Sequence, residues 1–105
     1  MIPFEVRTNV CDGLATVAVA GDLDCATAPR LRATLEGMAP GQNVVVDLSG
    51  TDFLDCAGVG VLLSSQRRLR QLGGDLVVGS PRSAVLRVLD ITGVLGVITV
   101  AGAES

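Results

Sequence analysis

The first twenty residues alternate apolar and polar positions in the way that half-exposed strands do. In FEVRTNV, residues 4–10, apolar residues are separated by polar or charged ones, which predicts a strand. The Asp12-Gly13 pair that follows is a strong signal for a tight turn. Residues 14–21, LATVAVAG, predict the returning strand. The two strands together therefore predict a hairpin.

The pattern then changes to that of a helix. Thr27 is placed to be an N-cap, and Pro29 suits the first helical turn. The apolar residues that follow share one helical face: Leu31, Leu35 and Met38. We expect this helix to end near Pro40-Gly41.

Three more segments continue the alternation of strand and helix. Residues 43–48, NVVVDL, form a near-continuous apolar run, which is typical of a strand buried on both faces. Residues 58–72 predict a helix that stops at Gly73-Gly74. Residues 75–79, DLVVG, predict another short buried strand.

The last quarter of the chain predicts one more helix and one more strand. Ser80-Pro81 is a good pair for the N-cap and first position of a helix that runs through Leu89 to about Gly93. Residues 97–100, VITV, predict a last short strand. We expect the tail, residues 101–105, to be disordered.

The predicted order is β-β-α-β-α-β-α-β, which indicates an α/β fold. Strands that alternate with helices pair in parallel through right-handed crossovers, and the initial hairpin makes the sheet mixed but mostly parallel. The 105 residues fit a single domain, 1–105, with a core over about 4–100. Only two residues are aromatic, so the core has to be built from aliphatic side chains.

Composition excludes several classes of function. The chain has eight arginines but no lysine and no histidine, and its net charge is −3. It therefore lacks the basic footprint of a nucleic-acid-binding protein and the usual general bases and Schiff-base amines of enzymes. No apolar run is long enough to span a membrane. Three cysteines, an odd number, fit a reducing compartment, so we expect a cytoplasmic protein.

Candidate site residues follow two of the predicted parallel strands. In open α/β sheets, function gathers beyond the carboxyl ends of such strands. Two loops meet this description, residues 21–25 and 49–60. If their strands are neighbours, these loops bring three acids and two thiols to one edge: Asp22, Asp24, Asp55, Cys25 and Cys56. Gly58 and Gly60 would let the backbone of a partner approach the start of the next helix.

The acids allow more than one interpretation. The Asp22-Leu23-Asp24 stretch has a superficial likeness to the start of an aspartate-dependent phosphatase or a phospho-acceptor receiver, but those chemistries normally need a lysine that this chain lacks. A metal site built from Asp22, Asp24 and Asp55 is conceivable. The favoured interpretation is that these acids cap helices and complement helix dipoles. We therefore predict no catalytic residue, no metal and no cofactor.

Longer motifs carry a resemblance to a known family. The stretches AGDLDCATAPRLRATL, VVVDLSGTDFLDCAGVGVLLSSQRRLRQLGGDLVVGSP and VLRVLDITGV cover most of residues 15–94. In them the chain resembles a STAS domain, the fold of bacterial anti-sigma-factor antagonists. The resemblance implies a protein that is not an enzyme. It would bind an anti-sigma factor, typically a serine kinase, and so release a sigma factor for transcription.

The same resemblance implies a set of partner-binding residues and a phosphorylation site. The loops and the helix start would face the partner through Asp22, Asp24, Asp55, Cys56, Ala57, Gly58, Val59 and Gly60. The family's phosphoacceptor is a serine or threonine directly after the loop aspartate, and here that position is Cys56. A switch by phosphorylation at that position is therefore not expected.

Three interpretations of Cys56 stay open. It marks an antagonist that is always competent to bind, or it is a redox switch with Cys25 as its partner, or it is a small apolar replacement for serine in a packed turn. The redox interpretation belongs to an alternative function, a STAS scaffold or sensor module that responds to a ligand or to oxidation. We expect a monomer or weak dimer.

One charged run is not explained by these motifs. Arg67, Arg68 and Arg70 lie on the polar side of the helix predicted over residues 58–72. Such a run is more often a solvated surface, although it can also contact an acidic partner.

Overall fold

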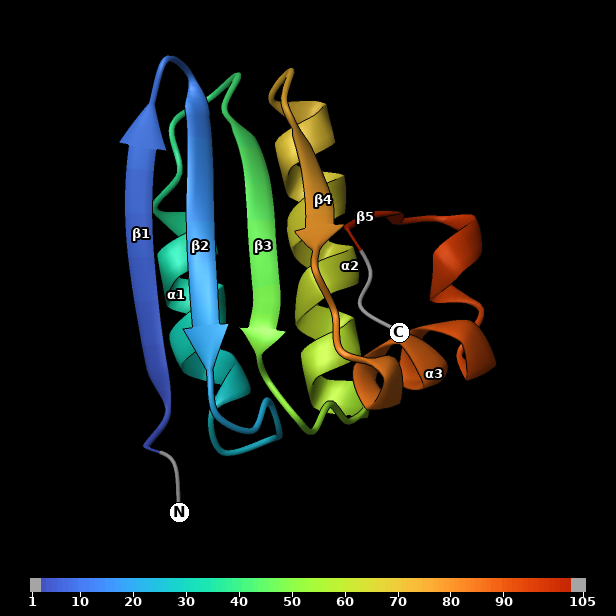
Figure 1. Cartoon of the computed structure of the whole chain (residues 1–105). Helices are drawn as coiled ribbons and strands as arrows, with labels where there is room; N and C mark the ends of the chain where they lie inside the picture. Colours follow the sequence, from blue (N-terminus) through green and yellow to red (C-terminus); the bar gives the residue numbers. More distant parts are fainter. Residues whose placement is uncertain (1–2, 103–105) are drawn as a thin grey trace.

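Five strands lie side by side in the order in which they occur along the chain (Figure 1). The computed structural model describes residues 3–102. Its elements are β1 (Glu5–Cys11), β2 (Leu14–Ala20), α1 (Ala28–Glu36), β3 (Asn43–Gly50), α2 (Cys56–Gln71), β4 (Asp75–Gly79), α3 (Ser83–Ile91), the short 3-10 helix η1 (Val94–Gly96) and β5 (Thr99–Ala101). The predicted order of strands and helices is confirmed, with η1 added before the last strand.

Strands β1 and β2 form the predicted hairpin. They pair antiparallel from Glu5↔Ala20 to Cys11↔Leu14. Asp12 and Gly13 have φ values of 52° and 80°, and positive φ at both positions matches the twist of a two-residue hairpin turn. Strands β2 to β5 all pair in parallel. The predicted mixed, mostly parallel sheet is therefore confirmed.

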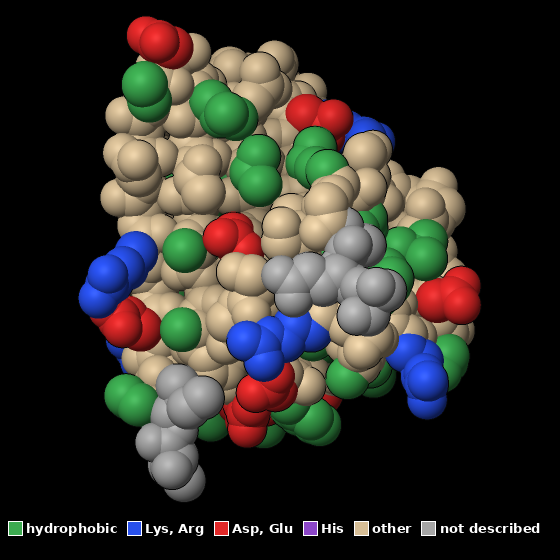
Figure 2. Space-filling model, in the orientation of Figure 1, with side chains coloured by type: hydrophobic (Ala, Val, Ile, Leu, Met, Phe, Trp, Pro, Cys, Tyr) green, Lys and Arg blue, Asp and Glu red, His purple; other side chains and the backbone are tan. Residues whose placement is uncertain are grey.

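Helices α1 and α2 lie against one face of the sheet (Figure 1). Figure 2 views the opposite face, where hydrophobic side chains lie scattered among backbone and other side chains. In β3, Val44, Val46 and Leu48 are buried, while Val45 and Asp47 are only half-buried. The prediction of a strand buried on both faces is wrong for β3, because the helices cover one face only.

The core between the sheet and its helices is aliphatic, as the composition predicts. Its largest fully buried side chains are Leu23, Leu31, Leu35, Leu48, Leu62, Leu69, Leu76, Leu89, Ile98, Val17, Val19 and Val44. Neither phenylalanine fills it. Phe4 packs at its margin, with the guanidinium of Arg30 5.0 Å from the ring centre, and Phe53 is 50% exposed.

Two predicted helix boundaries are wrong. Helix α1 ends at Glu36, before the predicted stop near Pro40-Gly41. The helix expected to open at Ser80-Pro81 begins at Ser83 instead. The Ser80 amide donates to the carbonyl of Ala101 at 2.7 Å, and Ser80 has a φ of 47°. Because this bond continues the pairing of β4 with β5, Ser80 cannot take the extended geometry of an N-cap.

The remaining boundaries differ by one or two residues. Helix α2 begins at Cys56, two residues before the predicted start. Strand β5 includes Ala101, so the expected disordered tail does not begin at residue 101. Residues 103–105 of that tail lie outside the described part of the chain. Within residues 3–102, no helix combines the length and apolarity needed to cross a membrane.

Candidate functional site

The two loops expected to meet at one edge of the sheet are joined by backbone hydrogen bonds. Gly21 N donates to the carbonyl of Gly50 at 2.9 Å, directly beyond the paired ends of β2 and β3. Leu23 then forms an isolated parallel bridge with Leu54. Leu23 N donates to the Phe53 carbonyl at 2.9 Å, and Asp55 N donates to the Leu23 carbonyl at 3.2 Å. We call residues 21–25 and 49–60 the loop edge.

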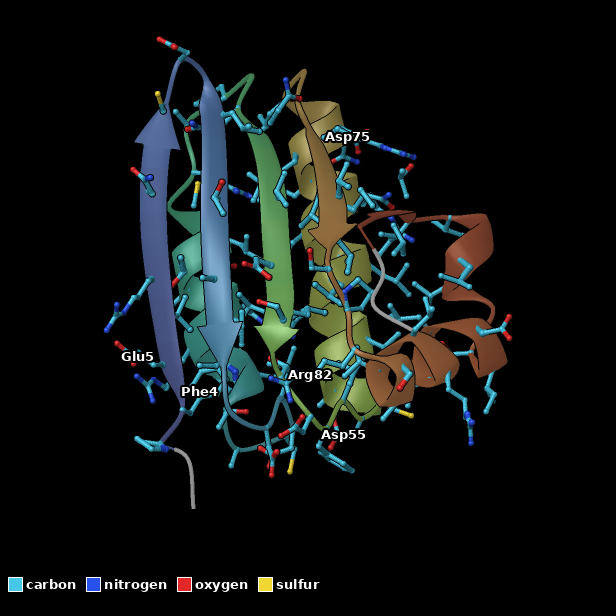
Figure 3. All side chains as sticks on the ribbon, in the orientation of Figure 1. Phe4, Glu5, Asp55, Asp75 and Arg82 are labelled. Atoms are coloured by element: carbon cyan, nitrogen blue, oxygen red, sulfur yellow. The ribbon has the colours of Figure 1, made fainter. Side chains whose placement is uncertain are left out.

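Asp55 starts helix α2. Its Oδ1 accepts from the backbone amides of Ala57 at 2.9 Å and Gly58 at 3.3 Å. The residue has extended backbone geometry, with φ −114° and ψ −174°, as an N-cap requires. The carboxylate thus satisfies two unpaired amides and lies at the positive end of the helix dipole (Figure 3). The capping interpretation is confirmed for Asp55.

Asp24 organises the turn that leads into α1. Its Oδ1 accepts from the amides of Ala26 at 2.9 Å and Thr27 at 3.1 Å. Thr27 occupies the predicted N-cap position, but its side chain makes no capping bond, since the hydroxyl donates to the Asp22 carbonyl at 2.7 Å. Asp24 is therefore held by its own loop. The exposed Asp22 side chain makes no hydrogen bond or ion pair to the described residues.

The acids do not assemble a metal site. Among the described residues, no three histidine, cysteine, aspartate or glutamate side chains are placed to hold one metal ion. The conceivable site of Asp22, Asp24 and Asp55 is thus not formed, because two of these carboxylates point at backbone amides of their own loops.

Cys25 and Cys56 are both exposed, free thiols. Cys25 lies in the first loop of the edge, and Cys56 is the first residue of α2. The backbone bridge of Leu23 with Leu54 lies two residues before each cysteine. The redox interpretation of this pair stays a prediction.

Gly58 and Val59 are not available to a partner in this structure, because both are buried. A Cβ atom on Gly58 would lie 2.5 Å from Leu54 Cδ1 and 2.8 Å from Leu23 Cγ. Gly58 therefore lets α2 approach the bridged leucines, and the idea that it admits a partner's backbone is wrong. Gly60 is exposed with open space around it, and Ala57 is half-buried.

Most of the chain matches a known family. The family model described as "Mlab, STAS domain" matches residues 10–99. The chain belongs to the STAS domain family. It is 29% identical to the anti-sigma-B factor antagonist of Listeria monocytogenes, over 98% of this chain and 91% of that protein.

Solved structures of similar proteins agree with this assignment. The crystal structure of an anti-sigma factor antagonist from Mycobacterium paratuberculosis has a TM-score of 0.84 at 26% identity, over 94% of this chain and 86% of that one. The anti-sigma factor antagonist SpoIIAA in its unphosphorylated form has a TM-score of 0.75 at 21% identity, over 94% and 88%. The second likeness concerns the fold alone. The predicted STAS resemblance is confirmed.

The loop edge of this STAS domain also contains an exposed aromatic residue that sequence reasoning missed. In the sequence Phe53 and Leu54 form an apolar pair, but Leu54 is buried against the core while Phe53 is half exposed. Because Leu54 pairs with Leu23 in a β-bridge, its neighbour in the chain points to the opposite side. The sequence contains one signal for this exposed contact residue: Phe53 is one of only two aromatic residues, and it stands next to an acid in a loop.

Arg82 ties the start of α3 to the same edge. Its Nε donates to the Ser49 carbonyl at 2.6 Å, and its Nη1 donates to Asp52 Oδ1 at 2.7 Å (Arg82 is labelled in Figure 3). Figure 2 shows arginine and acidic side chains side by side near the ends of β2 and β3. The two charged side chains are 49% and 59% exposed, so the pair orients the loop more than it stabilises the fold.

Proposed function

We propose that this STAS domain is an anti-sigma factor antagonist. It binds an anti-sigma factor of the serine-kinase type through the loop edge and so releases a sigma factor. The similarity to a protein of that name over nearly the full length of both chains supports the role. The loop edge is the proposed binding surface because its backbone is fixed by hydrogen bonds, while Asp22, Phe53 and Cys56 are exposed on it.

Phe53 and Asp22 are the proposed contacts at this edge. An exposed aromatic ring supplies a large apolar contact at a small cost in side-chain entropy, which is why aromatic residues are enriched in interfaces. The Asp22 carboxylate has no partner among residues 3–102, so a basic side chain of the anti-sigma factor can pair with it without breaking an existing bond. Asp24 and Asp55 support these contacts indirectly, because Asp24 holds its loop and Asp55 caps the start of helix α2.

We further propose that this antagonist is not switched off by phosphorylation at the family's usual position. The proposal rests on Cys56, which is exposed at the first position of α2. It has no hydroxyl for a serine kinase to modify. A phosphate there would add about −1.5 to −2 charges next to Asp55. Because that charge cannot be added at Cys56, we infer that the antagonist stays in its binding form in the presence of the kinase.

Two of the neighbouring hydroxyl groups, those of Thr51 and Ser64, already donate to backbone carbonyls. Thr51 is fully buried, and its hydroxyl donates to the Val19 carbonyl at 3.1 Å. Ser64 lies about two helical turns further along α2, where its hydroxyl donates to the Val61 carbonyl at 3.3 Å.

The test combines intact-mass analysis with binding. The native chain, Cys56→Ser and the matched control Cys25→Ser are each incubated with a kinase-type anti-sigma factor and ATP. We expect all three to bind before ATP is added, and only Cys56→Ser to gain a phosphate and lose binding afterwards. A phosphate on the native chain would contradict the unswitched form. Failure of the native chain and of Cys56→Ser to bind any kinase-type anti-sigma factor of its organism would contradict the function itself.

A further inference from the structure

A groove of about 550 Å³ runs along helix α2 and shares no residue with the loop edge. It is lined by Leu63, Gln66, Arg67, Arg70, Gln71 and Val97. The five residues from α2 are spaced as i, i+3, i+4, i+7 and i+8, so they form one stripe along the helix. Eight residues of helix rise about 12 Å. The groove is therefore long enough for about two turns of a bound helix.

The second wall of the groove is the segment that leads into β5. Val97 is 52% exposed, and its carbonyl accepts from Gln66 Nε2 at 2.9 Å. Gln66 itself is only 3% exposed, so this bond fixes the wall to α2. Two more large apolar side chains shortly before Val97 in the chain are exposed but do not line the groove: Ile91, the last residue of α3, at 77%, and Leu95 of η1 at 39%. Exposed apolar side chains concentrated in one segment are typical of a contact surface.

The charge of the groove is opposite to that of the molecule as a whole. Helix α2 contains three arginines and no acid, in a chain with net charge −3. Arg70 pairs with Asp75 at 2.9 Å, and Arg68 reaches the Leu35 carbonyl at 3.4 Å. Both also lie in the last turn, where they complement the helix dipole. Arg67 is exposed and makes no ion pair or hydrogen bond within residues 3–102.

We propose that this groove docks an acidic amphipathic segment of a second protein. Apolar side chains of that segment would pack on Leu63 and Val97, and a carboxylate would pair with Arg67. The choice of an acidic occupant follows from local charge complementarity, because Arg67 lines the groove, is exposed and has no ion pair within residues 3–102. The groove shares no residue with the loop edge, so this contact is distinct from the one proposed for the anti-sigma factor.

The test is an NMR titration of the ¹⁵N-labelled chain with a designed helical peptide. The peptide has leucines at i, i+3, i+4 and i+7 and glutamates on both sides of that stripe. We expect shifts in the backbone amides of residues 63–71 and 95–98, and weaker binding at high salt. The variant Arg67→Glu should bind about tenfold more weakly. Arg87→Glu, the same charge change on an exposed residue of α3, should bind as the native chain does.

Several results would overturn the proposal. Equal affinity for a peptide with lysines in place of the glutamates would exclude recognition by charge. Shifts confined to other surfaces, or no shifts at millimolar peptide, would exclude the groove as the docking site. Shifts of residues 63–71 on simple dilution of the chain would show that a second copy occupies the groove. None of these outcomes depends on the anti-sigma factor, so the proposed function is tested separately.

Discussion

The carboxylates of Asp55 and Asp22, both at the loop edge, have different roles. Asp55 is half-buried and accepts two amides of α2, whereas Asp22 is exposed and makes no side-chain bond to residues 3–102. Removal of either one can weaken partner binding, but only the first removal also damages the helix. A binding study that relied on Asp55 alone would therefore confuse a lost contact with a lost cap.

We predict that Asp55→Ala lowers the free energy of unfolding by about 1 kcal/mol, the usual cost of a lost N-cap. Asp55→Asn should recover most of this loss, because its amide oxygen can accept the same two bonds. Asp22→Ala should change stability by less than about 0.5 kcal/mol, as expected of an exposed side chain. Urea unfolding of the four proteins measures this. A destabilisation by Asp22→Ala as large as that by Asp55→Ala would contradict the division of roles.

The G-x-G pair at the start of α2 also divides into two roles. Gly58 is buried against Leu23 and Leu54, and the missing side chain is what allows the helix to approach them. Gly60, two residues later, faces open space. The sequence pattern treats the two glycines as equivalent, and only the packing of α2 on the bridged loops separates them.

We predict opposite effects for the same substitution at these positions. Gly58→Ala should destabilise the domain by about 1–3 kcal/mol, because its Cβ overlaps two leucine side chains that are already packed. Gly60→Ala should stabilise it by about 0.5–1 kcal/mol, the ordinary gain from alanine over glycine inside a helix. Thermal unfolding of both variants checks the signs. A Gly58→Ala protein as stable as the native one would show that the leucines move aside freely.

Local signals predicted the elements of this helix-and-strand alternation well, but long-range contacts decided where some of them begin. The Asp12-Gly13 turn is visible in the sequence because both residues tolerate positive φ. Ser80-Pro81 carries an equally good helix-start signal, yet the bond from Ser80 to Ala101 of β5 overrides it. A contact across twenty residues of chain has no local signature.

At the scale of the whole molecule, the sequence predicts where the candidate site lies but not what each of its residues does. The rule that parallel strands end at one edge is enough to bring Asp22, Asp24 and Asp55 together from the sequence alone. It could not tell the free carboxylate from those held by their own loops, since that depends on hydrogen-bond geometry. Arg82 and the groove along α2 were missed for a related reason. Their partners, Asp52 and Val97, lie about thirty residues away in the chain.

The charges of the whole chain determine how it responds to acid. It has eleven acidic residues and eight arginines, and its net charge at pH 7 is −3. The carboxylate of Asp75, at the start of β4, forms an ion pair: it accepts from Arg70 Nε at 2.9 Å and also from the Leu76 amide at 2.8 Å (Figure 3). The bond from Arg70, helped by that from Leu76, lowers the pKa of Asp75 below its ordinary value of 3.8.

We predict that this pair stabilises the folded chain at neutral pH and ceases to do so in acid. A carboxyl group with a lowered pKa in the folded state contributes stability above its unfolded pKa, and that contribution is lost as pH falls through the folded pKa. The side chains of Arg70 and Asp75 are about half exposed, so the contribution belongs with surface ion pairs, at about 0.2–1 kcal/mol. The free energies of unfolding of the native chain and of Asp75→Asn, measured in urea, should therefore differ at pH 7 and converge below pH 3.8.

The control is Glu36→Gln, which removes an exposed acid without an ion pair in residues 3–102. A difference between the native chain and Asp75→Asn that persisted unchanged to the lowest pH would assign the effect to packing at the start of β4 and not to charge.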